Sequence, residues 1–271
     1  DSLDAGVFVV HGAKWKVADR KEQLQIVGKH LTGTALRVLA EPFASAISMA
    51  DGKYAMPEDK RILANVSDVD RGTSDTVREG IASLCAILSN ERCLLPKCSD
   101  ADIDLFIRTV IDSVIATDDW RILASNDFIL PLLAEASPQI FLHCVKKGLS
   151  SSEAIHQFLS EKDGGIVPMN LGWGFTRGIQ IAAMPTESFP RALSLSQCLL
   201  TYSSLMEDAI VNILLPWLPS TEASPKTRMG AGRFLAQKDE DSWKVLMKLL
   251  PGVTTTKIGN PKPVYMKVSD F

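Results

Sequence analysis

The sequence predicts an all-α protein: an irregular helical-repeat, α-solenoid-like stack of short helices with an extended C-terminal tail. Two observations predict this class. Apolar residues recur three and four positions apart along most of the chain, and prolines or glycines interrupt these runs at short intervals. Strand-like runs are confined to Val7–Val10 and Val264–Val268. No strict period of about 34 or 40 residues is present, so any repeat is expected to be irregular.

Composition places the chain among globular proteins. It has 271 residues, of which 46% are hydrophobic and 23% charged, with a formal net charge of −3. These values exclude a disordered chain. Five scattered cysteines fit a reducing cytosol, and no apolar run approaches the roughly 18 residues of a membrane span. We therefore expect a cytoplasmic protein without membrane contact. Asp1 is not an initiator methionine, so we also expect a fragment of a longer polypeptide.

The N-terminal part, residues 1–72, predicts a helical segment followed by a connector. Its first helix places Leu24 and Val27 on the buried side. A second short helix is predicted to end near Pro42, because proline interrupts helical hydrogen bonding. Residues 50–72 combine glycine and proline with many charges, which indicates a loop or weakly ordered connector.

The central part, residues 73–252, predicts the helical stack. One helix begins after Ser74, with Val77 on its buried side, and another carries a capping signature at Ser99. The second has six positions predicted to face inward: Ile103, Phe106, Ile107, Val110, Ile111 and Val114. Shorter helices are predicted over 120–124, 126–136, 153–161, 175–184 and 187–203, and from 138, 209, 224 and 242. The remaining residues, 253–271, predict the extended tail.

No segment carries a catalytic or cofactor signature. A P-loop and a G-x-S-x-G elbow are absent from the sequence, and Gly172-x-Gly174 lacks the third glycine of a dinucleotide site. The pair Cys93 and Cys98 lacks the second pair of ligands that tetrahedral zinc needs. We therefore predict that this segment is not an enzyme and has no catalytic residue, cofactor or metal. Any NTPase activity is expected elsewhere in a parent chain.

Two alternatives to a non-enzymatic segment remain open. Asp51, Glu58 and Lys60 have the residue types of a metal-dependent nuclease core, but Pro57 places them in a loop-like stretch, where a charged loop is the ordinary interpretation. An enzyme site assembled from residues distant in the sequence also remains an alternative, because spacing alone does not reveal it.

Two features are candidate contacts for a partner. Trp173 lies in the glycine-rich stretch 162–174, and an exposed aromatic residue in a long loop is typical of a binding hot spot. Residues 226–267 hold nine basic and three acidic side chains. Three of the basic residues are candidate contacts for an acidic protein or for nucleic acid: Lys244, Lys248 and Lys257. A solvated helix face and tail is the ordinary interpretation of such a charge run.

Several segments resemble one protein family. Thr76–Leu84, Asp119–Leu142, Ala209–Thr221 and Ser242–Gly252 are similar, in this order, to segments from the helical C-terminal regions of large bacterial STAND NTPases of antiphage defence. The resemblance covers roughly residues 75–255. Members often have a longer insertion before the Pro-Trp-Leu-Pro motif than this chain has. The motif itself consists of residue types that shape a corner, so no catalytic residue is carried over.

The resemblance implies a function for the segment. In the family, an effector and a P-loop NTPase precede an α-solenoid, and the solenoid recognises a foreign protein and triggers oligomerisation. We therefore expect a non-enzymatic, ligand-sensing module that binds a protein, such as a phage protein, and that oligomerises through its parent chain. The alternatives are a helical scaffold for a host protein and a nucleic-acid-binding module that uses the basic region 226–267.

Overall fold

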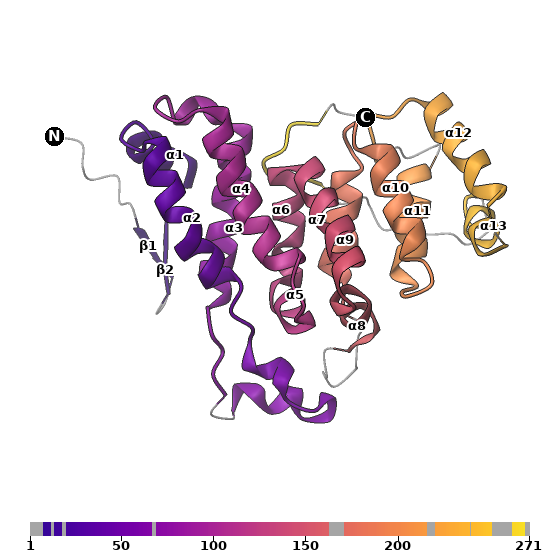
Figure 1. Cartoon of the computed structure of the whole chain (residues 1–271), viewed down its shortest axis with the longest axis horizontal. Coiled ribbons are helices and arrows are strands. Elements are labelled where there is room, and N and C mark those ends of the chain that lie inside the picture. Colours follow the sequence, from indigo (N-terminus) through magenta and orange to yellow (C-terminus); the bar gives the residue numbers. More distant parts are fainter. Residues whose placement is uncertain are drawn as a thin grey trace.

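A computed structural model describes most of the chain (Figure 1). The described residues are 8–11, 14–17, 20–66, 69–162, 171–215, 220–238, 240–250 and 262–268. The prediction of an all-α protein is confirmed, because thirteen α-helices and four short 3-10 helices make up most of the described chain. A small hairpin precedes them, in which β1 (Phe8–His11) pairs antiparallel with β2 (Lys14–Val17).

The helices are short, and most connections between them are brief. The α-helices are α1 (Arg20–Val27), α2 (Gly33–Ile47), α3 (Asp75–Asn90), α4 (Asp100–Ile115), α5 (Trp120–Asn126), α6 (Leu130–Ala136), α7 (Pro138–Ser151), α8 (Ala154–Ser160), α9 (Trp173–Ala182), α10 (Phe189–Cys198), α11 (Leu205–Leu214), α12 (Pro225–Ala236) and α13 (Glu240–Met247). The 3-10 helices are η1 (Gly52–Ala55), η2 (Glu58–Asn65), η3 (Arg92–Leu94) and η4 (Asp127–Ile129).

Most of the helices pack in two rows that follow the order of the chain. In one row α2 contacts α4, α4 contacts α7, and α7 contacts α10. In the other row α3 contacts α6, α6 contacts α9, α9 contacts α11, and α11 contacts α13. Figure 1 shows the helices side by side from the N-terminal to the C-terminal end, with α5 and α8 at the lower edge. The apolar core runs between the two rows.

Helix α4 shows why the sequence pattern produces this packing. The Ser99 side chain accepts the N–H of Asp102, and the Asp102 carboxylate accepts the N–H of Ser99, which completes the predicted capping box. All six predicted inward positions are buried, which confirms the periodicity. Burying each of these side chains contributes about 1.5–3 kcal/mol before the entropy cost of folding is subtracted. Phe106 also packs edge-on against Phe43 of α2, with ring centroids 5.8 Å apart.

Helix α2 corrects one prediction, because Pro42 lies inside it and does not end it. The proline cannot donate a hydrogen bond to the carbonyl of Val38. Val38 is exposed, so water can replace the missing donor. The prediction that Val27 is buried is also wrong, because Val27 is exposed in the last turn of α1, whereas Leu24 is buried as predicted.

The segment 50–72 is a further correction. The predicted loop contains two 3-10 helices, η1 and η2, and is anchored to the helices around it. Arg61 is buried, and its guanidinium donates to Glu161 at 3.0 Å and to the carbonyl of Lys162. The ion pair joins two parts of the chain that are 100 residues apart, which the local sequence pattern does not reveal.

Other predictions have different outcomes. Residues 264–268 do not form a strand, whereas the run at Val7–Val10 overlaps β1. The Pro-Trp-Leu-Pro corner, residues 216–219, lies outside the described residues, as do residues 163–170 of the glycine-rich stretch. The domain division at residues 72 and 252 stays a prediction. None of the described helices is both long and apolar enough to cross a membrane.

Candidate functional site

Trp173 is the first residue of α9, and the structure leaves it accessible. The residue is 49% exposed, and the Arg177 guanidinium lies 4.8 Å from the centroid of its ring. This cation–π contact orients the indole on the surface. Trp173 was predicted to lie in a loop, but it belongs to the first turn of a helix, directly after Gly172. Gly172 adopts φ +95°, a conformation that favours glycine.

Asp127 of η4 holds the start of α9. Its carboxylate accepts the backbone N–H of Gly174 at 3.1 Å and that of Phe175 at 2.8 Å. A Cβ on Gly174 would lie 1.7 Å from the carbonyl oxygen of Asp127, so only glycine permits this approach. Burial raises the pKa of Asp127, and the backbone hydrogen bonds act in the opposite direction. The pair Gly172-x-Gly174 therefore serves helix packing.

The next residue, Phe128, is 47% exposed and was not predicted as a contact residue. It belongs to η4, which contacts both α9 and α3. On the α3 side, Arg78 donates to the side-chain oxygen of Asn126 at 3.0 Å. The first turn of α3 and the first turn of α9 are thus both tied to the short segment that carries Phe128.

Val77 of α3 is a third exposed apolar residue on these neighbouring elements. The helical periodicity of α3 predicts it to be buried, but it is 47% exposed, whereas its neighbour Arg78 is buried. Because η4 contacts both α3 and α9, we group Val77, Phe128 and Trp173 under the name α3–η4–α9 face. Gly80 lies one turn beyond Val77, and a Cβ at this position would have no atom within 4 Å. No contact within the described chain requires a glycine there.

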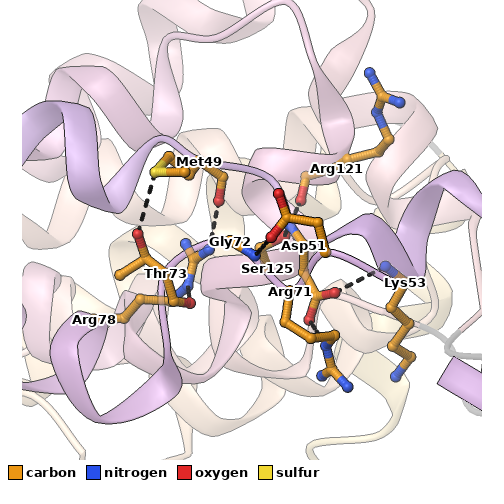
Figure 2. Close-up of polar contacts among 10 residues, drawn as sticks. Met49, Asp51, Lys53, Arg71, Gly72, Thr73, Arg78, Arg121 and Ser125 are labelled. Atoms are coloured by element: carbon orange, nitrogen blue, oxygen red, sulfur yellow. Dashed lines mark hydrogen bonds and ion pairs between the residues drawn. The ribbon is translucent and has the colours of Figure 1, made fainter. Parts of the chain in front are cut away.

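Arg78 ties several backbone segments together at the start of α3, and Figure 2 shows it beside Met49 and Thr73. Its side chain is only 1% exposed, and its guanidinium donates to the carbonyls of Ile47, Met49 and Thr73. Ile47 ends α2 and Met49 lies just beyond it, where backbone acceptors lack an intrahelical partner, whereas Thr73 precedes the N-cap of α3. Burial lowers the pKa of Arg78, while nearby carboxylates oppose this effect. The arginine therefore joins the end of α2 to the start of α3.

The same region contains the nuclease-like residues. The Asp51 carboxylate accepts the Nε–H of Arg71 and the backbone N–H of Lys53, both at 2.8 Å, and the N–H of Asp51 donates to Ser125 (Figure 2). Asp51 thus acts as a structural anchor for the connector. Glu58 is exposed on η2. Among the described residues, it does not belong to a cluster of side chains that could hold a metal ion.

An open cavity of about 590 Å³ lies beside η1. Its lining residues are Tyr54, Ala55, Thr117, Asp118, Asp119, Trp120 and Arg121. Arg61 lies over the Trp120 ring at 5.3 Å, and Arg121 pairs with Asp119 at 2.8 Å. The hydrogen bond from Arg121 holds the pKa of Asp119 below its usual value. This carboxylate is therefore already paired with a cation.

The basic candidates are partly neutralised where the structure describes them. Lys244 pairs with Glu240 at 3.2 Å, and Lys248 forms an ion pair with Glu207 of α11. Lys257 lies outside the described residues. Lys244 is not brought together with Trp173, because in the second row α11 lies between α9, which carries Trp173, and α13, which carries Lys244.

The cysteines occupy different environments. Burial raises the pKa of both Cys85 and Cys144 to about 12, while Cys93 is exposed and Cys98 lies 3.6 Å from the carbonyl oxygen of Leu31. Within the described ranges, no three histidine, cysteine, aspartate or glutamate side chains come close enough to hold a metal ion.

Comparisons with known proteins give no assignment. No protein-family model matches the chain, and neither the curated proteins nor the solved structures contain a significant match. The resemblance to STAND NTPases therefore stays a prediction, and the candidate site rests on its own geometry.

Proposed function

We propose that this chain is a non-enzymatic, protein-binding helical module, and that its partner binds the α3–η4–α9 face. The observation that carries this proposal is one large exposed apolar side chain from each of three neighbouring elements: Val77, Phe128 and Trp173. Tryptophan and arginine are enriched at binding hot spots, and here Arg177 lies directly on Trp173.

The hydrogen bonds that hold the elements of the α3–η4–α9 face in place suit a binding surface. Arg78 and Asp127 join the first turns of α3 and α9 to the segment 126–128 by hydrogen bonds that are buried at Arg78 and partly buried at Asp127. A surface fixed in this way loses little conformational entropy when a partner binds. The open position of Gly80 on α3 leaves room for a partner's backbone to approach closely.

We further propose that the two rows form an irregular α-solenoid within a larger bacterial antiphage defence NTPase. In solenoids each unit contacts mainly its neighbours, and the stack presents a long surface to partners. The neighbour-to-neighbour contacts along both rows support the architecture. The resemblance of the quoted segments supports the role in defence, with a phage protein as partner and oligomerisation through the parent chain.

The test uses a panel of individually produced phage proteins, with binding measured by biolayer interferometry. For a partner that binds, Trp173→Ala should weaken affinity at least about tenfold, which corresponds to about 1.4 kcal/mol. Trp243→Ala is the matched control, because Trp243 is similarly exposed but lies on α13. An affinity that depends on Trp243 and not on Trp173 would refute the assignment of the face.

A second arm of the experiment tests nucleic acid. The proposal expects no salt-dependent binding to a mixed-sequence DNA duplex. Tight DNA binding that falls steeply with salt and is lost in the double variant Lys244→Glu and Lys248→Glu would favour the nucleic-acid-binding alternative.

A further inference from the structure

Glu135, at the end of α6, binds the chain's own C-terminal segment. Its side chain is 2% exposed, and one carboxylate oxygen accepts three successive backbone N–H groups. The donors are Val264 at 2.8 Å, Tyr265 at 2.8 Å and Met266 at 3.3 Å. In Figure 1 the yellow segment runs beside the upper end of α6. Within the described ranges, the Glu135 carboxylate forms no ion pair.

This arrangement recognises backbone rather than side chains. Successive N–H groups that converge on one anion form a nest, a recurrent means of capturing charged groups and chain segments. A buried carboxylate without hydrogen-bond donors is strongly unfavourable, so the Glu135 site requires an occupant. Any segment that presents three N–H groups in the same way meets this requirement.

The segment 262–268 has few other strong contacts. Tyr265, Met266 and Val268 are only partly buried against the core, and Val264 is exposed. Lys267 reaches Glu91 at 3.7 Å from an exposed position. Besides this partial packing and one long ion pair, the described contacts of the segment are the three hydrogen bonds to Glu135.

A cavity of about 450 Å³ lies beside the bound segment. Its lining includes Glu135 and Met266, together with polar side chains of three further helices, among them Asn90, Arg108 and Gln139. The segment thus borders a hollow surface to which Met266 contributes, and release of the segment would widen the opening.

We propose that the Glu135 site is a peptide-binding site that residues 262–268 occupy reversibly, as an internal ligand. An external ligand is an extended segment with three free backbone N–H groups and apolar side chains at the positions of Tyr265 and Met266. This site is separate from the α3–η4–α9 face and does not depend on its function.

The test uses a fluorescein-labelled peptide with the sequence of residues 260–271 and the full chain carrying Tyr265→Pro. Proline removes the central N–H donor, so the chain's own segment no longer satisfies Glu135. Fluorescence anisotropy should show at least about tenfold tighter peptide binding to this variant than to the wild-type chain, in which the tethered segment competes. Tyr265→Ala, which keeps the N–H group, is the matched control.

Specificity is tested by a second substitution. Glu135→Ala added to Tyr265→Pro should abolish peptide binding, whereas Glu187→Ala, from the lining of the same cavity, should leave it unchanged. A folded Tyr265→Pro chain that does not bind the peptide, or binding that survives Glu135→Ala, overturns the proposal.

Hydrogen exchange of the wild-type chain gives an independent measurement that no folding defect can obscure. The amides of residues 264–266 should exchange by local release, faster than the core amides of α6. If they exchange only together with the α6 amides, the segment is an integral part of the fold, and the proposal is wrong.

Discussion

Replacing Arg78 tests whether the buried polar network holds the helix ends together. The guanidinium donates to four acceptors: the carbonyls of Ile47 and Thr73 and the side chain of Asn126, each at 3.0 Å, and the carbonyl of Met49. The Ile47 carbonyl keeps a second donor, the Asn126 amide at 2.8 Å. Arg78→Ala therefore removes the protein donor from three acceptors: the side chain of Asn126, which is buried, and the carbonyls of Met49 and Thr73, which are partly buried.

The magnitude follows from these three acceptors. The Asn126 side-chain oxygen is the fully buried acceptor, and leaving it unpaired costs about 1–3 kcal/mol. Water can reach the two partly buried carbonyls, so each of them costs less, and the gross loss is about 3–5 kcal/mol. Removing a buried charge recovers part of this free energy, because the guanidinium no longer has to leave water. The lowered pKa of Arg78, caused mainly by burial, indicates such a penalty. We expect a net loss of about 2–4 kcal/mol in the free energy of unfolding.

Urea unfolding followed by far-ultraviolet circular dichroism measures this loss. Arg71→Ala is the control, because Arg71 also forms a hydrogen-bonded ion pair in the same region but is largely exposed. Its loss should stay below about 1 kcal/mol. Equal losses for the two variants, or a loss under about 1.5 kcal/mol for Arg78→Ala, would show that the buried network contributes little.

Two further predictions concern glycine positions and thiols. Gly80→Ala should raise the free energy of unfolding by about 0.5–1 kcal/mol in thermal or urea unfolding, because alanine favours helix and meets no atom within 4 Å. Gly178→Ala should destabilise the chain, since its Cβ would lie 2.9 Å from the Phe141 ring. Cys85, whose pKa is raised to about 12, should resist Ellman's reagent in the native chain at pH 8, whereas the exposed Cys198 should react promptly. Fast modification of Cys85 without unfolding would contradict its burial.

Local sequence signals predicted the helices well where the deciding interactions are also local. The capping box of Ser99 and Asp102 spans three residues, and the six apolar positions of α4 repeat within one helix. The start of α7 at Ser137 and Pro138 follows from the same kind of signal. Each of these features depends on residues a few positions apart, so the sequence pattern carries the information.

The predictions failed where contacts between residues far apart in the sequence determine which side chains are buried. Periodicity placed Val77 inside and gave no reason to bury Arg78, because the acceptors of that arginine include Asn126, 48 residues away. The order of the connector likewise depends on the contact of Arg61 with Glu161. Single-sequence patterns do not contain such pairings, and a buried charged residue is disfavoured unless its partners are known.

The candidate face was missed for the same reason. Trp173 was singled out, but Phe128 and Val77 join it only because η4 lies between α3 and α9. One signal was available in the sequence: Gly80 interrupts an otherwise strong helical pattern, and such a glycine costs about 1 kcal/mol relative to alanine. No packing contact within the described chain explains the glycine at position 80. We therefore propose that a binding partner occupies the space beside it.

The polar interior and the apolar face are therefore two parts of one arrangement. Arg78 fixes the start of α3 against Asn126, and Asp127 fixes the start of α9. Phe128 follows these two residues directly, so its position is set by hydrogen bonds on both sides. If the buried hydrogen bonds served stability alone, apolar side chains of similar volume could replace them. Hydrogen bonds are directional, so these bonds fix the orientation of the first turns of α3 and α9 relative to each other. The proposed binding surface combines residues from several elements, and it therefore depends on this fixed orientation.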